Sequence, residues 1–249
     1  MLEVEGLSKS LGGVNAVRDV SLSLPGGMVT CVIGPNGAGK TTLFNAINGY
    51  VRHDSGTIRY RGVEIGSLSP SRRASLGIGR LWQDIRLFGN MTVLENLRAA
   101  KKSHAGESLI SCFLRRDAVR RVEAEVRESA EKILELIRLG DKRHSLARDL
   151  SYGQQKLLGL GRLLMNGADL LLLDEPTSGV NPLMIDKIVE FVRTLSAEGK
   201  TILMIEHNIR EAANVSDWIH VMNEGAIIRS GPPASVISNQ SLKEVYMSV

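Results

Sequence analysis

One short segment restricts the possible folds of this chain more than any other feature. Residues 34–41 read Gly-Pro-Asn-Gly-Ala-Gly-Lys-Thr and fit the phosphate-loop pattern GxxxxGK(S/T). The preceding residues 28–33 form a short apolar run, which is typical of a strand buried on both faces. Residues 41–49 are predicted to form a helix that ends at a glycine. A strand, a glycine-rich turn and a helix in this order predict a phosphate-binding α/β domain.

The residue types in this loop suit a nucleotide's phosphates. Its glycines allow consecutive backbone N–H groups to point at one anion, and the start of the helix adds positive potential. Lys40 can reach the β- and γ-phosphates, and the Thr41 hydroxyl can bind Mg²⁺. The expected nucleotide-binding residues are Gly34, Pro35, Asn36, Gly37, Ala38, Gly39, Lys40, Thr41 and Thr42.

Two carboxylates follow a second apolar run. Residues 170–173 are all Leu, and Asp174 and Glu175 come directly after them, where a buried strand would end beside the phosphate loop. Mg²⁺ bound to phosphates takes one or two carboxylates plus waters, so Asp174 suits the metal. Glu175 would then orient and deprotonate an attacking water as the general base. The alternative is a pair of surface acids at a strand end, and the phosphate loop favours the functional interpretation.

A third motif lies at residues 150–155, which read Leu-Ser-Tyr-Gly-Gln-Gln and precede an apolar helical stretch. A Ser hydroxyl, a Gly amide and a helix N-terminus can together form a second anion site. The segment resembles the LSGGQ signature of the ATP-binding cassette (ABC) family, with Tyr152 in place of the first Gly. The resemblance implies a head-to-tail dimer in which the signature of one cassette closes on the ATP of the other. The signature residues are Ser151, Tyr152, Gly153 and Gln154.

Further motifs resemble the ABC family and occur in the family's order. Gln83 matches the Q-loop, whose Gln contacts Mg²⁺ or the attacking water and senses the transmembrane partner. Residues 178–181 match the D-loop, although Asn181 stands where the family often has Asp. His207 matches the switch histidine that contacts the γ-phosphate. The resemblance therefore implies ATP and Mg²⁺ as ligands, Glu175, His207 and Gln83 as catalytic residues, and a metal site formed by Thr41, Gln83 and Asp174.

The expected adenine contact departs from the family pattern. Leu11 occupies the position where the family usually has an aromatic residue that stacks on adenine. Stacking of a base on an aromatic ring contributes roughly 1–3 kcal/mol in nucleic-acid complexes. We therefore expect Leu11 to hold adenine more weakly, with Val17 as additional packing.

The resemblance implies an α/β fold: a P-loop NTPase cassette with a parallel-sheet core, an antiparallel β subdomain and a helical subdomain. Residues 2–7 and 17–24 alternate as antiparallel strands do. Residues 91–150 lack Pro, are dense in charge and carry apolar residues at helical spacing. We expect one ATP-binding domain over residues 1–249, with core and β subdomain in 1–90 and 151–249 and a helical insertion over about 91–150.

Composition excludes other classes of protein. The chain has 249 residues, of which 43% are hydrophobic, and this excludes disorder. No apolar run approaches the ~20 residues of a membrane-spanning helix, and the N-terminus does not read as a signal peptide. Cys31 and Cys112 lie in no disulfide or zinc spacing. The net charge of +4 comes without a block of like charges, so we expect no nucleic-acid partner.

The kind of cassette is narrowed by what surrounds the motifs. Lys40 and Ser151 are too close for the long coiled coil of the repair and chromosome-organising ATPases, and residues 208–249 are too few for the regulatory domain of sugar importers. The SYGQQ signature, Asn181-Pro182 and the ending Glu244-Val245-Tyr246 resemble the ATPase subunits of branched-chain amino acid importers. Urea and amide importers, lipopolysaccharide-export cassettes and a soluble ATP-switched binding module are the alternatives.

The resemblance also implies partners. They are transmembrane permease subunits, a second cassette that is the same chain or a paralogue, and, indirectly, a periplasmic or extracellular solute-binding protein. A permease helix is expected to dock at residues 83–88, beside the helical insertion. The implied location is the cytoplasm, peripheral on the inner membrane.

Overall fold

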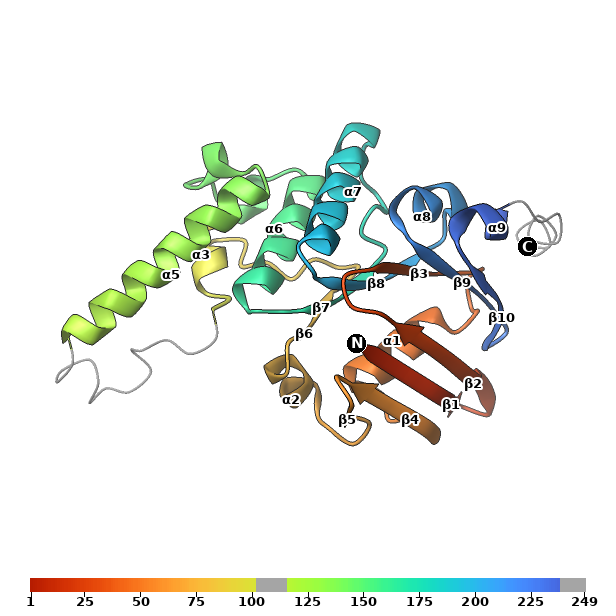
Figure 1. Ribbon diagram of the computed structural model, residues 1–249. Helices are drawn as coiled ribbons and strands as arrows, with labels where there is room; N and C mark the ends of the chain where they lie inside the picture. The colour runs from red at the N-terminus through yellow and green to blue at the C-terminus, as the bar shows by residue number, and fades with distance from the viewer. Residues whose placement is uncertain (102–115, 238–249) are drawn as a thin grey trace. The chain divides into compact units, whose positions relative to one another are not determined.

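The structure is a computed structural model, and it describes residues 1–101 and 116–237, with side chains from residue 120 onward in the second stretch (Figure 1). Cys112 and the ending Glu244-Val245-Tyr246 lie outside the described residues. The chain divides into two compact units. The first contains Met1–Gln83, Asp169–Ser178 and the chain from Asp186 onward, and the second contains Asp84–Ala168 and Gly179–Ile185.

The first unit contains an antiparallel sheet built from alternating sequences. Its strand order is β2-β1-β4-β5, with β1 at Leu2–Leu11, β2 at Val14–Leu24, β4 at Ser55–Tyr60 and β5 at Val63–Glu64. Leu2 and Val4 are buried while Glu3 between them is exposed, as expected for strands with one buried face. The strands predicted over 2–7 and 17–24 are confirmed, and both extend further toward the turn that joins them.

The second sheet of this unit is mostly parallel, and its central strands are buried on both faces. Its order is β10-β9-β3-β8-β7-β6, and only the β10–β9 pair is antiparallel. Every residue of β3 and β7 is buried, which explains why their sequences are continuous apolar runs. The strands are β3 (Val29–Ile33), β6 (Ile78–Leu81), β7 (Leu170–Asp174), β8 (Thr201–Glu206), β9 (Trp218–Asn223) and β10 (Ala226–Gly231).

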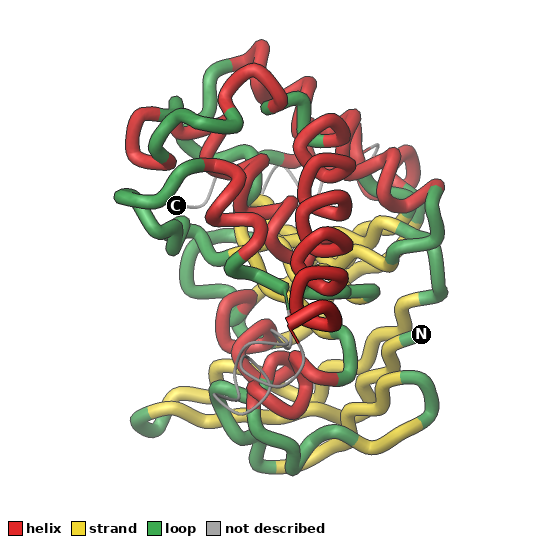
Figure 2. The backbone as a smooth tube through the Cα atoms, turned by 90° about the vertical axis from the view of Figure 1, so that its left-hand side faces the viewer, coloured by secondary structure: helices red, strands yellow, loops and turns green. Residues whose placement is uncertain are grey.

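Helix α1 (Lys40–Asn48) lies between the two sheets, which form separate layers of strands in Figures 1 and 2. One core cluster joins buried residues of both sheets to Leu43, Phe44 and Ile47 of this helix. The helix ends as predicted, because Gly49 adopts a left-handed φ of 81°.

The other helices of the unit are α2 (Pro70–Ser75), α7 (Pro182–Ala197, whose first turn belongs to the second unit), α8 (Ile209–Val215) and α9 (Pro233–Ile237).

The second unit is helical, in agreement with the period of its apolar residues. It contains α3 (Val93–Arg98), α5 (Arg116–Leu136), the short 3₁₀ helices Gly140–Lys142 and Ala147–Asp149, and α6 (Tyr152–Met165). Ala130, Leu134 and Ile137 are buried and form one face of the predicted helix. A Cβ atom on Gly161 of α6 would lie 3.0 Å from Ile133 and 3.1 Å from Leu97. This glycine therefore allows α3, α5 and α6 to pack closely.

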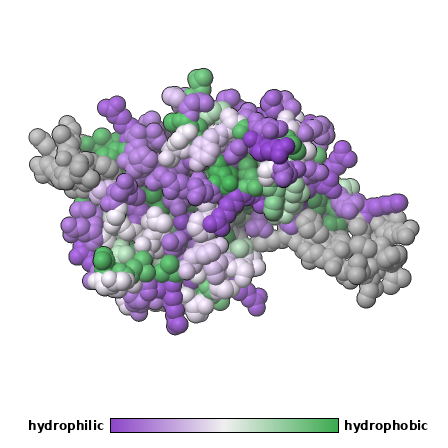
Figure 3. All heavy atoms as spheres, turned by 180° about the vertical axis from the view of Figure 1, so that it is seen from behind, coloured by the Kyte–Doolittle hydropathy of each residue, from purple (hydrophilic) through white to green (hydrophobic). Residues whose placement is uncertain are grey.

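Within the described stretches, no helix is both long and apolar enough to span a bilayer. Hydrophobic side chains on the face shown in Figure 3 form small patches among hydrophilic ones.

Candidate functional site

The phosphate loop is shaped by glycines that no other residue could replace without strain. Gly39 precedes α1 with a φ of 100°, and a Cβ atom there would lie 2.0 Å from the carbonyl oxygen of Ala16. Gly37 also has a left-handed φ of 82°. The sequence prediction of a glycine-rich turn between a strand and a helix is thus realised by β3, residues 34–39 and α1.

The side chain of Lys40 hydrogen-bonds to the backbone of the phosphate loop. Its Nζ donates to the carbonyl oxygens of Gly34 at 2.6 Å and Pro35 at 2.9 Å. The side chain is only 6% exposed, and this burial lowers the pKa of Lys40, opposed by the nearby Glu175 and Asp174. Because both acceptors are neutral carbonyls, the ammonium charge remains available to an incoming polyanion.

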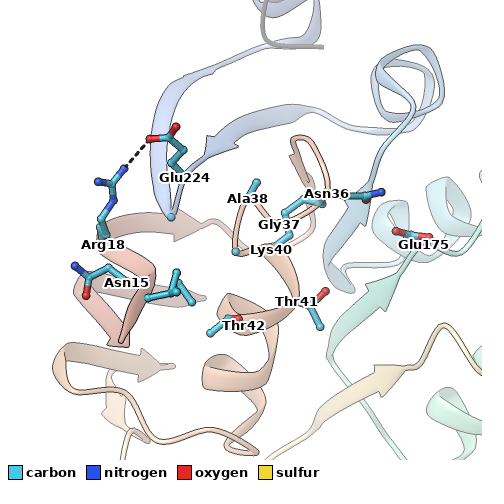
Figure 4. A pocket seen from close by; sticks show the side chains of 14 residues that line it. Asn15, Arg18, Asn36, Gly37, Ala38, Lys40, Thr41, Thr42, Glu175 and Glu224 are labelled. Atoms are coloured by element: carbon cyan, nitrogen blue, oxygen red, sulfur yellow. Dashed lines mark ion pairs between the residues drawn. The ribbon is translucent and has the colours of Figure 1, made fainter. Parts of the chain in front are cut away.

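A pocket of about 600 Å³ opens over this loop (Figure 4). Arg18 and Glu224, which form an ion pair at 3.7 Å, lie at one end, and Glu175 lies at the other. The N-terminus of α1 is between them, so phosphates bound at Lys40 and Thr41 would have Glu175 on one side and room for a nucleoside on the other. The lining residues are Val14, Asn15, Ala16, Arg18, Asn36, Gly37, Ala38, Gly39, Lys40, Thr41, Thr42, Glu175, Glu224 and Gly225.

The two residues expected at the adenine do not line this pocket. Leu11 is 45% exposed at the end of β1, and Val17 is 1% exposed in the core. Their neighbours Val14, Asn15, Ala16 and Arg18 line it instead, together with the β9–β10 turn. That turn is attached to the loop, because Gly225 donates its N–H to the carbonyl of Ala38 at 3.0 Å and accepts from Arg18 N–H at 2.7 Å. The sequence did not predict these hydrogen bonds, because they join the β9–β10 turn to segments far away in the chain.

Three predicted catalytic side chains come together at the end of β7. Gln83 donates from Nε2 to Oε2 of Glu175 at 3.2 Å, and Nδ1 of His207 lies 3.8 Å from Oε1 of the same carboxylate. Glu175 has a φ of 48°, unusual for a residue with a side chain, and its N–H donates to the carbonyl of Ile205 at 3.1 Å. This geometry places a carboxylate, an amide and an imidazole around one point beside the phosphate loop.

The predicted metal residues fit Mg²⁺ held largely by phosphates and water. Thr41 lines the pocket, and the Gln83 side chain reaches Glu175. Asp174 pairs through Oδ2 with Arg80, which leaves Oδ1 outside that ion pair. Among the described residues no three His, Cys, Asp or Glu side chains form a metal cage, and Mg²⁺ bound to a nucleotide does not require one.

A buried acid that sequence reasoning missed lies next to this site. Glu206 ends β8, is fully buried and immediately precedes His207. Burial, with a smaller effect of the nearby Glu211 and Glu175, raises the pKa of Glu206 to about 7, although hydrogen bonds from Thr177 oppose the shift. The sequence signal that could have identified Glu206 is its place directly after the apolar residues 202–205.

The signature residues belong to the second unit, where they begin α6. Ser151 caps the helix, since its Oγ accepts from Gln154 N–H at 3.3 Å while Gln154 Oε1 accepts from Ser151 N–H at 3.0 Å. Tyr152 is 41% exposed. A Cβ atom on Gly153 would lie 3.0 Å from side-chain atoms of Val180 and Met184, so a larger residue here would crowd the start of α7. Asn181 accepts from Met184 N–H at 3.0 Å through its side-chain oxygen, a role that Asp could also perform.

Comparison with known proteins agrees with this set of motifs. The family model described as "ABC transporter" matches residues 17–178. The chain belongs to the ABC transporter family. The ATP-binding protein BraF of branched-chain amino acid transport from Pseudomonas aeruginosa is 37% identical over 99% of the cassette and 97% of its own length. LivG of Salmonella typhimurium, a high-affinity branched-chain amino acid transport ATP-binding protein, is 36% identical over the same shares.

Solved structures give the same assignment. A nucleotide-free ATP-binding cassette from an ABC transporter superposes with a TM-score of 0.85 at 35% identity, covering 99% of the cassette and 98% of that chain. The α/β cassette fold, nucleotide binding and ATPase activity coupled to transport are therefore properties of this chain.

Proposed function

We propose that this chain powers the ATP-dependent import of branched-chain amino acids as the peripheral, cytoplasmic subunit of a membrane complex. The two relatives reported above act in branched-chain amino acid transport and match the chain over nearly its whole length. The single observation that carries the ATPase mechanism is the meeting of Gln83 and His207 at Glu175, at the phosphate end of the pocket.

The side chains divide the chemistry between them. Backbone N–H groups of residues 36–41 and the N-terminus of α1 bind the phosphates, and Lys40 neutralises their charge. Glu175 accepts a proton from the attacking water as the general base. His207 and Gln83 hold this carboxylate and the γ-phosphate in line. Bound Mg²⁺, held by Thr41, Gln83 and Asp174, would offset the charge that develops on the phosphate oxygens.

We further propose the assembly that this mechanism requires. Two cassettes pair head to tail, so that Ser151, Tyr152, Gly153 and Gln154 of one subunit approach the ATP of the other. Closure of this pair would move the attached permease subunits, which receive the solute from a solute-binding protein outside the membrane. The exposure of Ser151 and Tyr152 at the start of α6 supports this role for the signature.

Glu175→Gln tests the mechanism. The substitution keeps the shape of the side chain and removes the base, so we expect ATP binding to remain and turnover to fall by about 100-fold or more. Glu198→Gln, which removes an exposed carboxylate after α7, is the matched control and should keep normal turnover. ATP hydrolysis by Glu175→Gln at the normal rate would exclude the assignment.

The transport proposal needs its own experiment. The native chain is purified from membranes, and the uptake of labelled leucine, isoleucine and valine is compared between cells with the native chain and cells with Glu175→Gln. We expect copurification of permease subunits and loss of uptake in the variant. Loss of urea, amide or lipopolysaccharide transport alone would assign another cargo. Failure to recover any permease would favour a soluble ATP-switched module.

A further inference from the structure

The side chain of Thr177 connects two buried or half-buried acids beside the catalytic end of the pocket. Oε1 of Glu206 lies within hydrogen-bond distance of Thr177 Oγ1, at 2.8 Å, and 3.4 Å from Thr177 N. The same Oγ1 atom is also in hydrogen-bond contact with Oε2 of Glu211 on α8. Asn208 Nδ2 donates to the other oxygen of Glu211 at 3.0 Å. One hydroxyl group thus links the end of β8 to α8.

The number of hydrogens shared by Thr177, Glu206 and Glu211 limits how many of the two carboxyl groups can be ionised. A threonine hydroxyl carries a single hydrogen, and an ionised carboxylate can only accept. Thr177 can donate to Glu206 or to Glu211, but not to both. Both contacts can be hydrogen bonds only if one of the two carboxyl groups is protonated and donates to the hydroxyl oxygen.

The surroundings of Glu206 favour keeping that proton. Glu206 is fully buried, and the groups that face it are Cys31 of β3, Glu175 after β7 and Glu211 of α8. Among the described residues, no Lys, Arg or His nitrogen lies within ion-pair distance of Glu206, and its Oε2 has no hydrogen-bond partner. Deprotonation would add a negative charge among acids with no described cation in ion-pair contact, Lys40 lying beyond Cys31 and Glu175, which is costly in a buried site.

We propose that Glu206 and Glu211 share one proton through Thr177 and that this neutral arrangement positions Glu175 and His207. Thr177 follows Glu175 by two residues, and His207 follows Glu206 directly. The shared proton therefore fixes the loop after β7 against the loop after β8, the loops that carry the proposed base and switch histidine. This inference rests on the roles proposed above for those two residues. Glu206, Thr177 and Glu211 are positioning residues, and none of them lines the nucleotide pocket.

Loss of the shared proton should lower activity as the pH rises. At alkaline pH the hydroxyl would face two carboxylates, only one of which it can satisfy. Their repulsion would push α8 away from the end of β8, and the loop after β7 would lose one of its two contacts through Thr177. A folded-state pKa above the usual value means that this arrangement is complete at low pH and is lost as pH rises through about 7. We therefore expect kcat to fall on the alkaline side while the KM for ATP changes little, because the phosphate loop is not part of this group.

Glu206→Gln is the informative substitution, since a neutral amide imitates the protonated acid and cannot ionise. ATP hydrolysis is measured from pH 6 to pH 9 for the native chain, Glu206→Gln and Glu198→Gln. We expect the native chain and Glu198→Gln to share one alkaline fall in kcat, and Glu206→Gln to shift this fall upward by at least about one pH unit. The same alkaline fall in Glu206→Gln and the native chain would overturn the proposal, as would no alkaline fall in the native chain.

A second pair of variants tests the link itself and does not depend on how well Glu206→Gln folds. Thr177→Val removes the hydroxyl and should lower kcat by about tenfold with the KM for ATP within about threefold, whereas Thr177→Ser should restore kcat. Equal activity of the Val and Ser variants would overturn the proposal. Glu175→Gln, measured at pH 6.5, separates the two questions: if this variant is active, the proposed base is wrong, whatever the pH profiles show.

Discussion

Arg80 of β6 and Asp174 of β7 form a buried ion pair, with Nη2 of the guanidinium 2.6 Å from Oδ2 of the carboxylate. Their side chains are 2% and 9% exposed, and Nη1 of Arg80 donates to Asn45 Oδ1 at 2.6 Å. The guanidinium also lies 3.9 Å from the ring centroid of Trp82. A charge that is this deeply buried must be paired, so β6, β7 and α1 depend on one another through Arg80.

Arg80→Met should therefore destabilise the fold strongly. The substitution leaves the Asp174 carboxylate buried without its cation, and the free energy of unfolding should fall by about 3–5 kcal/mol. Arg59→Met is the control, because Arg59 pairs with Glu5 at the surface and its loss should cost at most about 1 kcal/mol. Urea denaturation of both variants gives the comparison. Equal destabilisation would show that burial of the Arg80 pair has no special effect.

Lys40→Ala and His207→Ala should separate binding from turnover. Lys40 neutralises phosphate charge in the ground state and in the transition state, so its loss should abolish both ATP binding and hydrolysis. His207 lies at Glu175 and outside the pocket lining, so its loss should lower turnover and largely spare affinity. Equilibrium binding of a fluorescent ATP analogue and steady-state hydrolysis measure the two effects. Equal losses of affinity would refute this division.

Leu11→Tyr examines the adenine contact. If a ring at this position can lie over the base, ATP binding should tighten by up to roughly 1 kcal/mol. Leu11 is exposed but outside the pocket lining, whereas Val14 and Arg18 line it. Val63→Tyr, which adds a ring at an exposed position of β5, is the control and should bind ATP normally. Unchanged ATP affinity of Leu11→Tyr would assign the base to the residues that line the pocket.

Ile85→Asp and Leu87→Asp should uncouple the subunit without inactivating it. Both residues are half-buried, and neither lines the nucleotide pocket, so the isolated chain should remain folded and hydrolyse ATP. If a permease helix docks at residues 83–88, as the resemblance implies, a new carboxylate there is costly to bury, so permease binding and solute uptake should be lost. Ile228→Asp, at an exposed apolar residue of β10, is the control. Normal permease binding by Ile85→Asp and Leu87→Asp would place the docking surface elsewhere.

The sequence could predict those parts of the fold whose physical cause is local. Buried parallel strands are continuous apolar runs, which is why β3 and β7 were found, and the glycine pattern determined the phosphate loop between β3 and α1. Strand β6 was missed because it contains Gly79 and Arg80, and an arginine inside a buried strand is tolerated only with the partner that tertiary structure provides. The short β5 and α2 were missed as well.

The candidate site also divides into features with a local cause, which the sequence predicts, and features that depend on tertiary contacts. The end of an apolar run pointed to Glu175, and Gln83 and His207 lie beside it, while their catalytic roles stay predictions. The far end of the pocket could not be found in this way, since the turn at Gly225 meets Ala38 through hydrogen bonds between segments distant in the chain. Glu206 was missed because its burial and its contact with Thr177 depend on the packing of β8 against its neighbours.

The stacking around Arg80 also provides an optical probe. The chain has two tryptophans, and Trp82 is the residue directly before Gln83. Its ring lies under the Arg80 guanidinium and meets Tyr50 edge-on at 4.9 Å between centroids. Indole emission depends on nearby charge and ring contacts, so a rearrangement at Gln83 would change the fluorescence of Trp82. Replacement of Trp218 by Phe would leave Trp82 as the single tryptophan, one residue before the glutamine that donates to Glu175, with no added label.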